Sequence, residues 1–208
     1  SRGRIVDSLI STSIAERGIA NVLLSREAGQ GQIAVAIFLV DRYCLGVKNA
    51  VAFMVAEARY SELLQSFGEE GLRKITPESA RRLVEESVEF ARGLGFPPHS
   101  EYAIARLIFG EIDPQLAHER FEMGRKGKPF YISGPEDSPV RARVIVQTLE
   151  RTCGAGNYDY LCPGGAGPPM PHFLDAEWLD GDAEEEWEEL EQDADDWEDP
   201  TSEPPRPS

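Results

Sequence analysis

The apolar run 33–55, IAVAIFLVDRYCLGVKNAVAFMV, constrains the fold more than any other part of the sequence. It is long enough to cross a membrane as a helix, for which about 20 apolar residues suffice. Its charged residues Asp41, Arg42 and Lys48 would then lie near the bilayer centre, where each costs about 2.5 to 3.5 kcal/mol. We therefore exclude a membrane-spanning helix and expect no membrane partner.

The composition of this run predicts buried β-structure instead, because β-branched and aromatic residues dominate it. Gly46 interrupts the run, so we expect strands at 32–41 and 45–56. A further strand at 19–25 precedes them, and the turn at 27–32 contains two glycines that can take positive φ. The sequence thus predicts an antiparallel meander of three strands, with the middle strand apolar on both faces.

Helix signals dominate the rest of the body. An N-cap residue stands directly before a proline at Thr76, Asp113 and Ser138, a pattern typical of helix starts. Together with apolar periodicity, these signals predict four to five helices and a short helical turn, at 56–67, 77–93, 101–109, 114–121 and 139–152, with the turn between 11 and 18. The last helix is expected to bury Val140, Val144, Thr148 and Leu149.

One or two late strands, at 130–133 and 157–161, are expected to return to the sheet. Strands followed by helices and late strands indicate an α+β fold. We place this globular domain at 1–162.

Charge divides the chain into two parts. The total net charge is −16, and the stretch 163–208 alone has 16 acidic residues and one basic residue, for a net of −15. Subtraction leaves −1 for residues 1–162, so the body is nearly neutral. Residues 163–174 read as a Gly/Pro linker, and 175–208 as an acidic tail that is disordered on its own.

The acidic tail contains a helical pattern at 183–197. Trp187, Leu190 and Trp197 share one face of that helix, and carboxylates cover the rest. Repulsion among the carboxylates should prevent the helix from forming alone. We expect it to fold on a partner that supplies an apolar groove with a basic rim.

Cysteine usage points to a reducing compartment. Three cysteines, without a signal peptide or a CxxC motif, indicate free thiols in the cytoplasm. They give no sign of a structural zinc site, and the sequence indicates no cofactor.

Candidate catalytic residues cluster after the central strand, at Asp41, Cys44 and Lys48, with His99 further along. A cation beside Cys44 would lower its pKa and make the thiolate a nucleophile, with His99 as base. Alternatively, Asp41 could hold Mg²⁺ together with carboxylates from the set Glu57, Glu101 and Asp113. The structural interpretation is that Cys44 is simply buried, while Asp41 and Lys48 pair or bind the turn backbone.

A candidate binding face surrounds the turn 124–129, GRKGKP. Its members are Arg125, Lys126, Lys128 and Tyr131, with Arg141 and Arg143 on the following helix. The turn lacks the G-x-x-x-x-G-K-[ST] form of a phosphate-binding loop. The face could bind RNA, with Phe130 and Tyr131 stacking on bases, or receive the acidic tail.

Three segments, 18–50, 91–113 and 124–139, resemble the signature of an uncharacterised bacterial family. That family combines a D-x-x-C-L-G-V-K-[ND] core with F-x-P-H and G-K-P-x-Y-x-x-G-P segments. The resemblance covers most of 18–161 and implies no known activity. Family members have a cysteine before the first strand, where this chain has Ser8, so the resemblance implies that a cysteine or metal pair with Cys44 is not essential here.

Two functional hypotheses remain open. The first is a non-enzymatic interaction or regulatory module whose tail docks a protein partner or the basic face of the body, where nucleic acid would compete. The second is a metal-dependent nuclease or another hydrolase that uses Asp41, Cys44 and His99. The sequence favours the first without deciding whether the protein is an enzyme.

Overall fold

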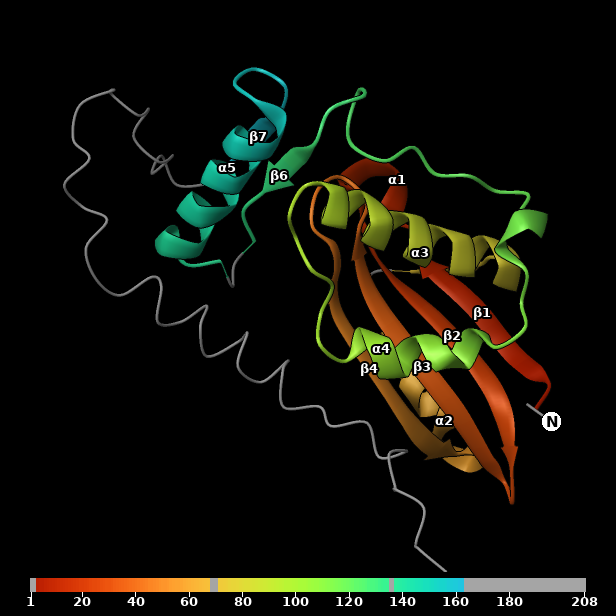
Figure 1. Cartoon of the computed structure of the whole chain (residues 1–208). Coiled ribbons are helices and arrows are strands. Elements are labelled where there is room, and N and C mark those ends of the chain that lie inside the picture. Colours follow the sequence, from red (N-terminus) through yellow and green to blue (C-terminus); the bar gives the residue numbers. More distant parts are fainter. Residues whose placement is uncertain (1–2, 68–70, 135–136, 163–208) are drawn as a thin grey trace, which may run out of the picture. The chain divides into compact units, whose positions relative to one another are not determined.

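The structure is a computed structural model that describes residues 3–67, 71–134 and 137–162 (Figure 1). Its elements, in chain order, are β1 (Ile5–Ser11), α1 (Ile14–Arg17), β2 (Ile19–Gly29), β3 (Gln32–Asp41), β4 (Gly46–Ala56), α2 (Glu57–Gln65), β5 (Leu72–Lys74), α3 (Pro77–Gly93), α4 (Tyr102–Ala105), the 3₁₀ helices η2 (Arg106–Phe109) and η3 (Pro114–Leu116), β6 (Phe130–Ile132), α5 (Pro139–Cys153) and β7 (Asp159–Leu161). The linker, the acidic tail and the helix predicted at 183–197 lie outside the described residues.

The main sheet has five antiparallel strands in the order β4-β3-β2-β1-β5. The predicted meander corresponds to β2, β3 and β4 and is confirmed, as is the α+β class. The sequence missed β1 and β5. Asp7 and Ser8 interrupt the apolar pattern of β1, and β5 has only three residues, too few to show a period.

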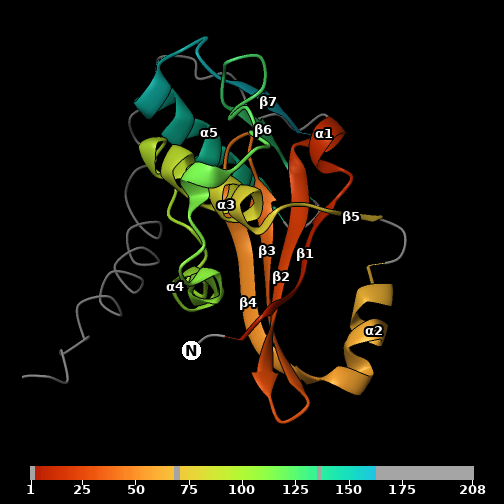
Figure 2. The same cartoon turned by 90° about the vertical axis from the view of Figure 1, so that its right-hand side faces the viewer.

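Helices cover both faces of this sheet (Figure 2). The face under α3 and α4, called the α3 face, holds the largest core, which includes Val22, Phe38 and Leu83. The opposite face, called the α2 face, packs Leu23 and Val35 against α2. Alternate residues of each strand therefore enter different cores, as the pleat of a strand requires.

The predicted caps are present at all three helix starts. The side-chain oxygen of Thr76 accepts from Ser79 N at 3.3 Å, and that of Ser138 accepts from Arg141 N at 3.2 Å. Asp113 Oδ1 accepts from Gln115 N at 2.9 Å, but only the single 3₁₀ turn η3 follows it. The helix predicted at 101–109 is also shorter, because α4 tightens into η2 at Arg106, and its N-cap is Glu101.

The late strands do not return to the main sheet, which corrects the prediction. β6 and β7 pair with each other in parallel, and Phe130 N donates to Tyr43 O in the turn after β3. A second core forms there from Cys44, Leu45, Leu94, Tyr131 and the buried side of α5.

The buried side of α5 also differs from the predicted stripe. Val140 is 70% exposed, while the buried residues are Ala142, Ile145, Val146 and Leu149. These residues form an i, i+3, i+4, i+7 stripe that shares only Leu149 with the predicted one. Both faces of the helix are apolar in the sequence, and packing against Tyr131 and Leu45 determines which face is buried.

Candidate functional site

The turn between β3 and β4 is closed around the carboxylate of Asp41. Asp41 is only 3% exposed, and its two oxygens accept from the amides of Tyr43, Cys44 and Leu45 at 2.9, 3.2 and 3.3 Å. Burial raises the pKa of Asp41, although the three amides and Lys48 oppose that shift. The carboxylate therefore binds the backbone of the turn, as in the structural interpretation.

Cys44 is completely buried beside this carboxylate. Burial, followed by the charge of Asp41, raises the pKa of its thiol far above the ordinary value. A nucleophilic cysteine needs the opposite, an accessible sulfur with a lowered pKa. The charge of Lys48 lowers the pKa of this thiol, but burial outweighs it.

Lys48 reaches Asp137, just before the start of α5. Its Nζ lies 4.0 Å from Asp137 Oδ2, which also accepts from Tyr131 OH at 3.1 Å and from Gly134 N at 2.8 Å. Arg141 Nε lies 3.2 Å from the other oxygen of Asp137. This polar cluster joins the main sheet to α5, and neither Lys48 nor Arg141 is left as an isolated charge.

His99, the predicted base, lies beside Glu101 at the start of α4. His99 N donates to Val47 O at 2.9 Å, and its Nδ1 accepts from Glu101 N at 3.3 Å. Within the described ranges, no three His, Cys, Asp or Glu residues form a group that could hold a metal ion. The hydrolase hypothesis centred on Asp41, Cys44 and His99 stays a prediction.

The basic face is only partly as expected. Arg125, Lys126 and Lys128 are exposed, and none of them forms a salt bridge with a described carboxylate. Tyr131, however, is fully buried, and burial raises the pKa of its hydroxyl, so its ring cannot stack on a base.

Phe130 is buried as well and lies under Arg125, whose guanidinium carbon is 4.7 Å from the ring centroid. Arg143 is exposed on α5. What remains of the predicted face is a short charged turn, with no aromatic platform from Phe130 or Tyr131.

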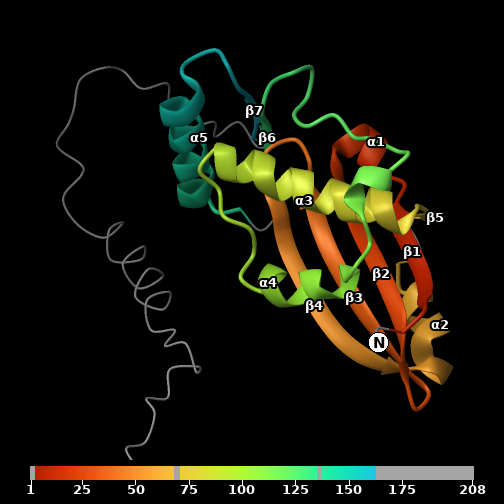
Figure 3. The ribbon, with the colours of Figure 1, turned by 45° about the vertical axis from the view of Figure 1, so that its right-hand side comes forward.

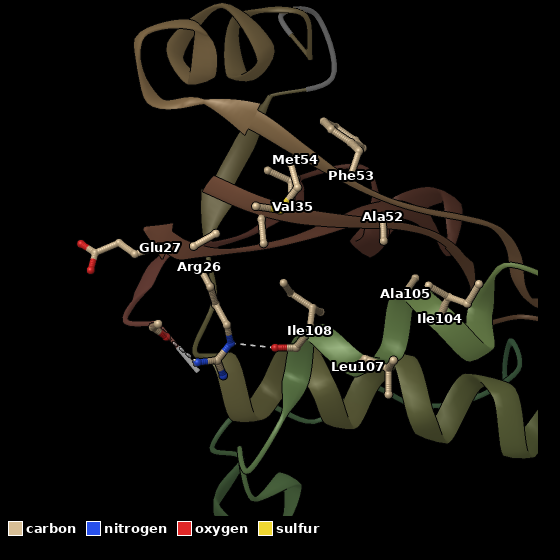
Figure 4. Close-up of a pocket in the computed structure, with 13 residues that line it drawn as sticks. Arg26, Glu27, Val35, Ala52, Phe53, Met54, Ile104, Ala105, Leu107 and Ile108 are labelled. Carbon is tan, nitrogen blue, oxygen red and sulfur yellow. Dashed lines mark hydrogen bonds between the residues drawn. The ribbon is translucent and has the colours of Figure 1, made fainter. Parts of the chain in front are cut away.

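An open apolar groove lies elsewhere, at the far end of the sheet (Figure 4). We define it by four large side chains on its walls, Met54, Ile104, Leu107 and Ile108, and by Ala34 and Ala52 on its floor. Its volume is about 460 Å³. Met54, Ile104 and Leu107 are 55%, 62% and 60% exposed, which is unusual for neighbouring large apolar side chains.

Arg26 on β2 fixes the wall of this groove. Its guanidinium donates to Ile108 O at 2.7 Å, to Phe109 O at 3.0 Å and to Gly3 O at 3.0 Å. The carbonyls of Ile108 and Phe109 end η2, so the arginine supplies the donors that the helix end lacks. The groove is therefore preformed, because both walls are tied to the same sheet.

The sequence contained two signals for this groove. Ile104 and Leu107 lie on the outer side of a helix whose inner side carries the buried residues Ala105 and Phe109. β4 carries large apolar residues on both faces, although it is an edge strand. Neither signal pointed to a site until the position of β4 in the sheet was known.

Comparisons with protein-family models, curated proteins and solved structures give no significant match. The resemblance to an uncharacterised family thus stays a prediction. In the described part of the chain, no helix has the length and apolar character needed to cross a bilayer.

Proposed function

We propose that this protein is a non-enzymatic interaction module whose apolar groove binds the tryptophan-bearing segment 183–197 of its own chain, so that a protein partner must compete for the groove. The observation that carries this proposal is the exposure of Met54, Ile104 and Leu107 around one preformed cavity. Exposed apolar patches of this kind mark binding sites in soluble proteins.

The shape of the groove favours a large flat side chain. Alanines form the floor and longer side chains form the walls, so the cavity is deeper than a flat sheet face. A volume of about 460 Å³ exceeds what one indole requires and suits an indole with its neighbouring leucine. Trp187 and Leu190 are three residues apart and would share one helical face.

The segment can reach the groove. Trp187 follows Cys162, the last described residue, by 25 residues. A flexible chain of that length has a root-mean-square span of about 25 to 30 Å. Fully extended, the same stretch spans about 80 Å, which exceeds the width of a body whose radius of gyration is about 15 Å for its length.

Charge supports the same occupant. Arg106 stands between Ala105 and Leu107, is exposed, and forms no salt bridge with a described carboxylate. The segment 183–197 is rich in carboxylates beside its tryptophans. Arg106 therefore supplies positive charge beside Leu107 for an acidic helix, in the mode of helix-in-groove recognition, while the groove lining itself contains Arg26 and Glu27.

Intrinsic fluorescence tests the proposal directly, because all three tryptophans lie after residue 177 and none lies in the body. In the full-length protein, Leu107→Lys should shift tryptophan emission to the red and increase acrylamide quenching, since the indole loses its apolar site. Val140→Lys is the matched control, because Val140 is equally exposed but lies on α5. It should leave both readouts unchanged.

Charge reversal of the basic turn tests the alternative that the tail docks there and not in the groove. If Lys126→Glu with Lys128→Glu shifts the emission and Leu107→Lys does not, the tail docks on the basic turn and the groove proposal is wrong. Emission equal to that of the urea-unfolded chain in the unmodified protein would also overturn it.

A further inference from the structure

The outer edge of β4 is open over most of its length. β4 pairs with β3 on one side and is the terminal strand of the sheet (Figures 1 and 3). At its start, Val47 O accepts from His99 N, so the segment before α4 covers that end. From Lys48 to Ala56, no described strand pairs with the outer edge.

This edge lacks the usual protection against pairing. Residues 49–56, NAVAFMVA, contain no charge and no proline. A bulge at Lys48 disrupts only the beginning of the strand. Val51, Phe53 and Met54 are all more than a third exposed, so apolar side chains are presented on both faces. Soluble proteins normally place charges, prolines or bulges on such an edge, and an edge without them is a template for another strand.

We propose that the occupant is β4 of a second copy of this chain, paired antiparallel about a two-fold axis at Ala52. The usable stretch runs from Lys48, just past the residue bound by His99, to Ala56 at the end of β4. Ala52 is its midpoint, so a self-pairing that uses the whole stretch is centred there. The two sheets would join into one antiparallel sheet across the axis.

The strand is complementary to itself in this register. Val51 of one copy stands opposite Phe53 of the other on the α2 face, a β-branched residue against an aromatic one. On the α3 face, Met54 stands opposite the small Ala50, and Ala52 meets Ala52. A larger side chain thus faces a smaller one at each of the two pairs that flank the axis.

The charge at the start of the strand does not oppose this register. Lys48 lies beside Asp137 of its own copy and stands opposite the uncharged Ala56 of the other. By contrast, the stretch 163–208 has a net charge of −15 in each copy and opposes association. Raising the salt concentration screens that long-range repulsion more than the backbone pairing, so the dimer should tighten with salt.

Sedimentation of the full-length protein over a range of concentrations and salt tests this pairing. Ala52→Lys places two like charges directly opposite each other and should raise the dimer dissociation constant about tenfold or more. Ala52→Glu should do the same. Mixing the two variants should restore a dimer, because Lys and Glu then meet across the axis. Val140→Lys, on α5, should dimerise like the unmodified protein.

Three results would overturn the inference. They are an unmodified chain that stays monomeric at high concentration and high salt, an Ala52→Lys chain that dimerises normally, and a mixture that fails to pair although the unmodified chain does. Restoration by mixing also shows that both variants fold. Because the readout is mass and not tryptophan emission, failure here leaves the proposed function untouched.

Discussion

The turn after β3 and the apolar groove make opposite use of their side chains. In and beside the turn lie Asp41, Cys44 and Lys48, residue types that are often catalytic. Here Asp41 binds backbone amides, Cys44 is buried, and Lys48 lies beside Asp137. The groove is built from methionine, isoleucine, leucine and alanine, and its large side chains remain open to solvent. The chemical reactivity of a residue type is thus a weaker guide to a functional site than the exposure of that residue in the folded protein.

The largest difference between the two regions should appear in thiol labelling. Cys44 is buried, whereas Cys153 and Cys162 are half-buried. With a thiol reagent under native conditions, we expect two thiols to react readily and the third at least about 10³-fold more slowly, because Cys44 reacts only when the body opens. Mass spectrometry identifies the protected site. Equal labelling of all three would return Cys44 to the list of candidate nucleophiles.

Asp41→Ala should be the most destabilising single change in the turn. It leaves three buried amides without an acceptor, and we expect the free energy of unfolding to fall by about 4 kcal/mol. Asp41→Asn retains one acceptor oxygen and no longer buries a charge, so about half of that loss is expected. Urea denaturation measures both. A loss below about 1 kcal/mol for Asp41→Ala would mean that the turn does not depend on the carboxylate.

Two glycine substitutions measure how tightly the turn is packed. Gly46 has a φ of +66°, and a Cβ there would lie 2.7 Å from Ala91 Cβ and 2.8 Å from Ser87 O. Gly46→Ala should therefore cost about 3 kcal/mol from backbone strain and overpacking together. Gly31 has a φ of +69° but no neighbour within 4 Å, so Gly31→Ala should cost only about 1 kcal/mol. Equal costs in thermal or urea unfolding would contradict the close approach.

The smallest effect is expected in the groove. Leu107→Ser should change the free energy of unfolding by no more than about 0.5 kcal/mol, because the side chain is already in water. Leu149→Ser, in the core under α5, should cost about 3 kcal/mol or more. A large loss at Leu107 would show that the groove wall supports the fold and is not held open for a ligand.

Local patterns were sufficient to predict the central elements of the fold. β-Branched and aromatic composition and a breaking glycine located β3 and β4, and proline-linked caps located α3 and α5. β5 was missed because pairing with β1, and not its own sequence, makes it a strand. The face of α5 was wrong for the same reason, since two apolar registers were available and only the second core selects one.

The candidate sites followed a similar rule. The sequence identified Asp41 as unusual because a carboxylate stands within an apolar run, but not that three amides satisfy it. The groove could not be predicted, because its walls at Met54 and Ile104 are about 50 residues apart in the chain. Arg26 on β2 ties the helical wall to the sheet. Exposure of an apolar residue is a property of the assembled surface, which no local pattern contains.

The turn after β3 also has a consequence for how the protein folds. Val40 and Val47 on its two sides belong to the main core, while Cys44 and Leu45 belong to the core under α5. The residues from 130 onward are synthesised late, and the wall against which they pack exists only after β3 and β4 have formed their hairpin. Assembly should therefore be sequential, with the second core docking last. Melting should be cooperative, because one short turn carries residues of both cores and neither core can open without loosening that turn.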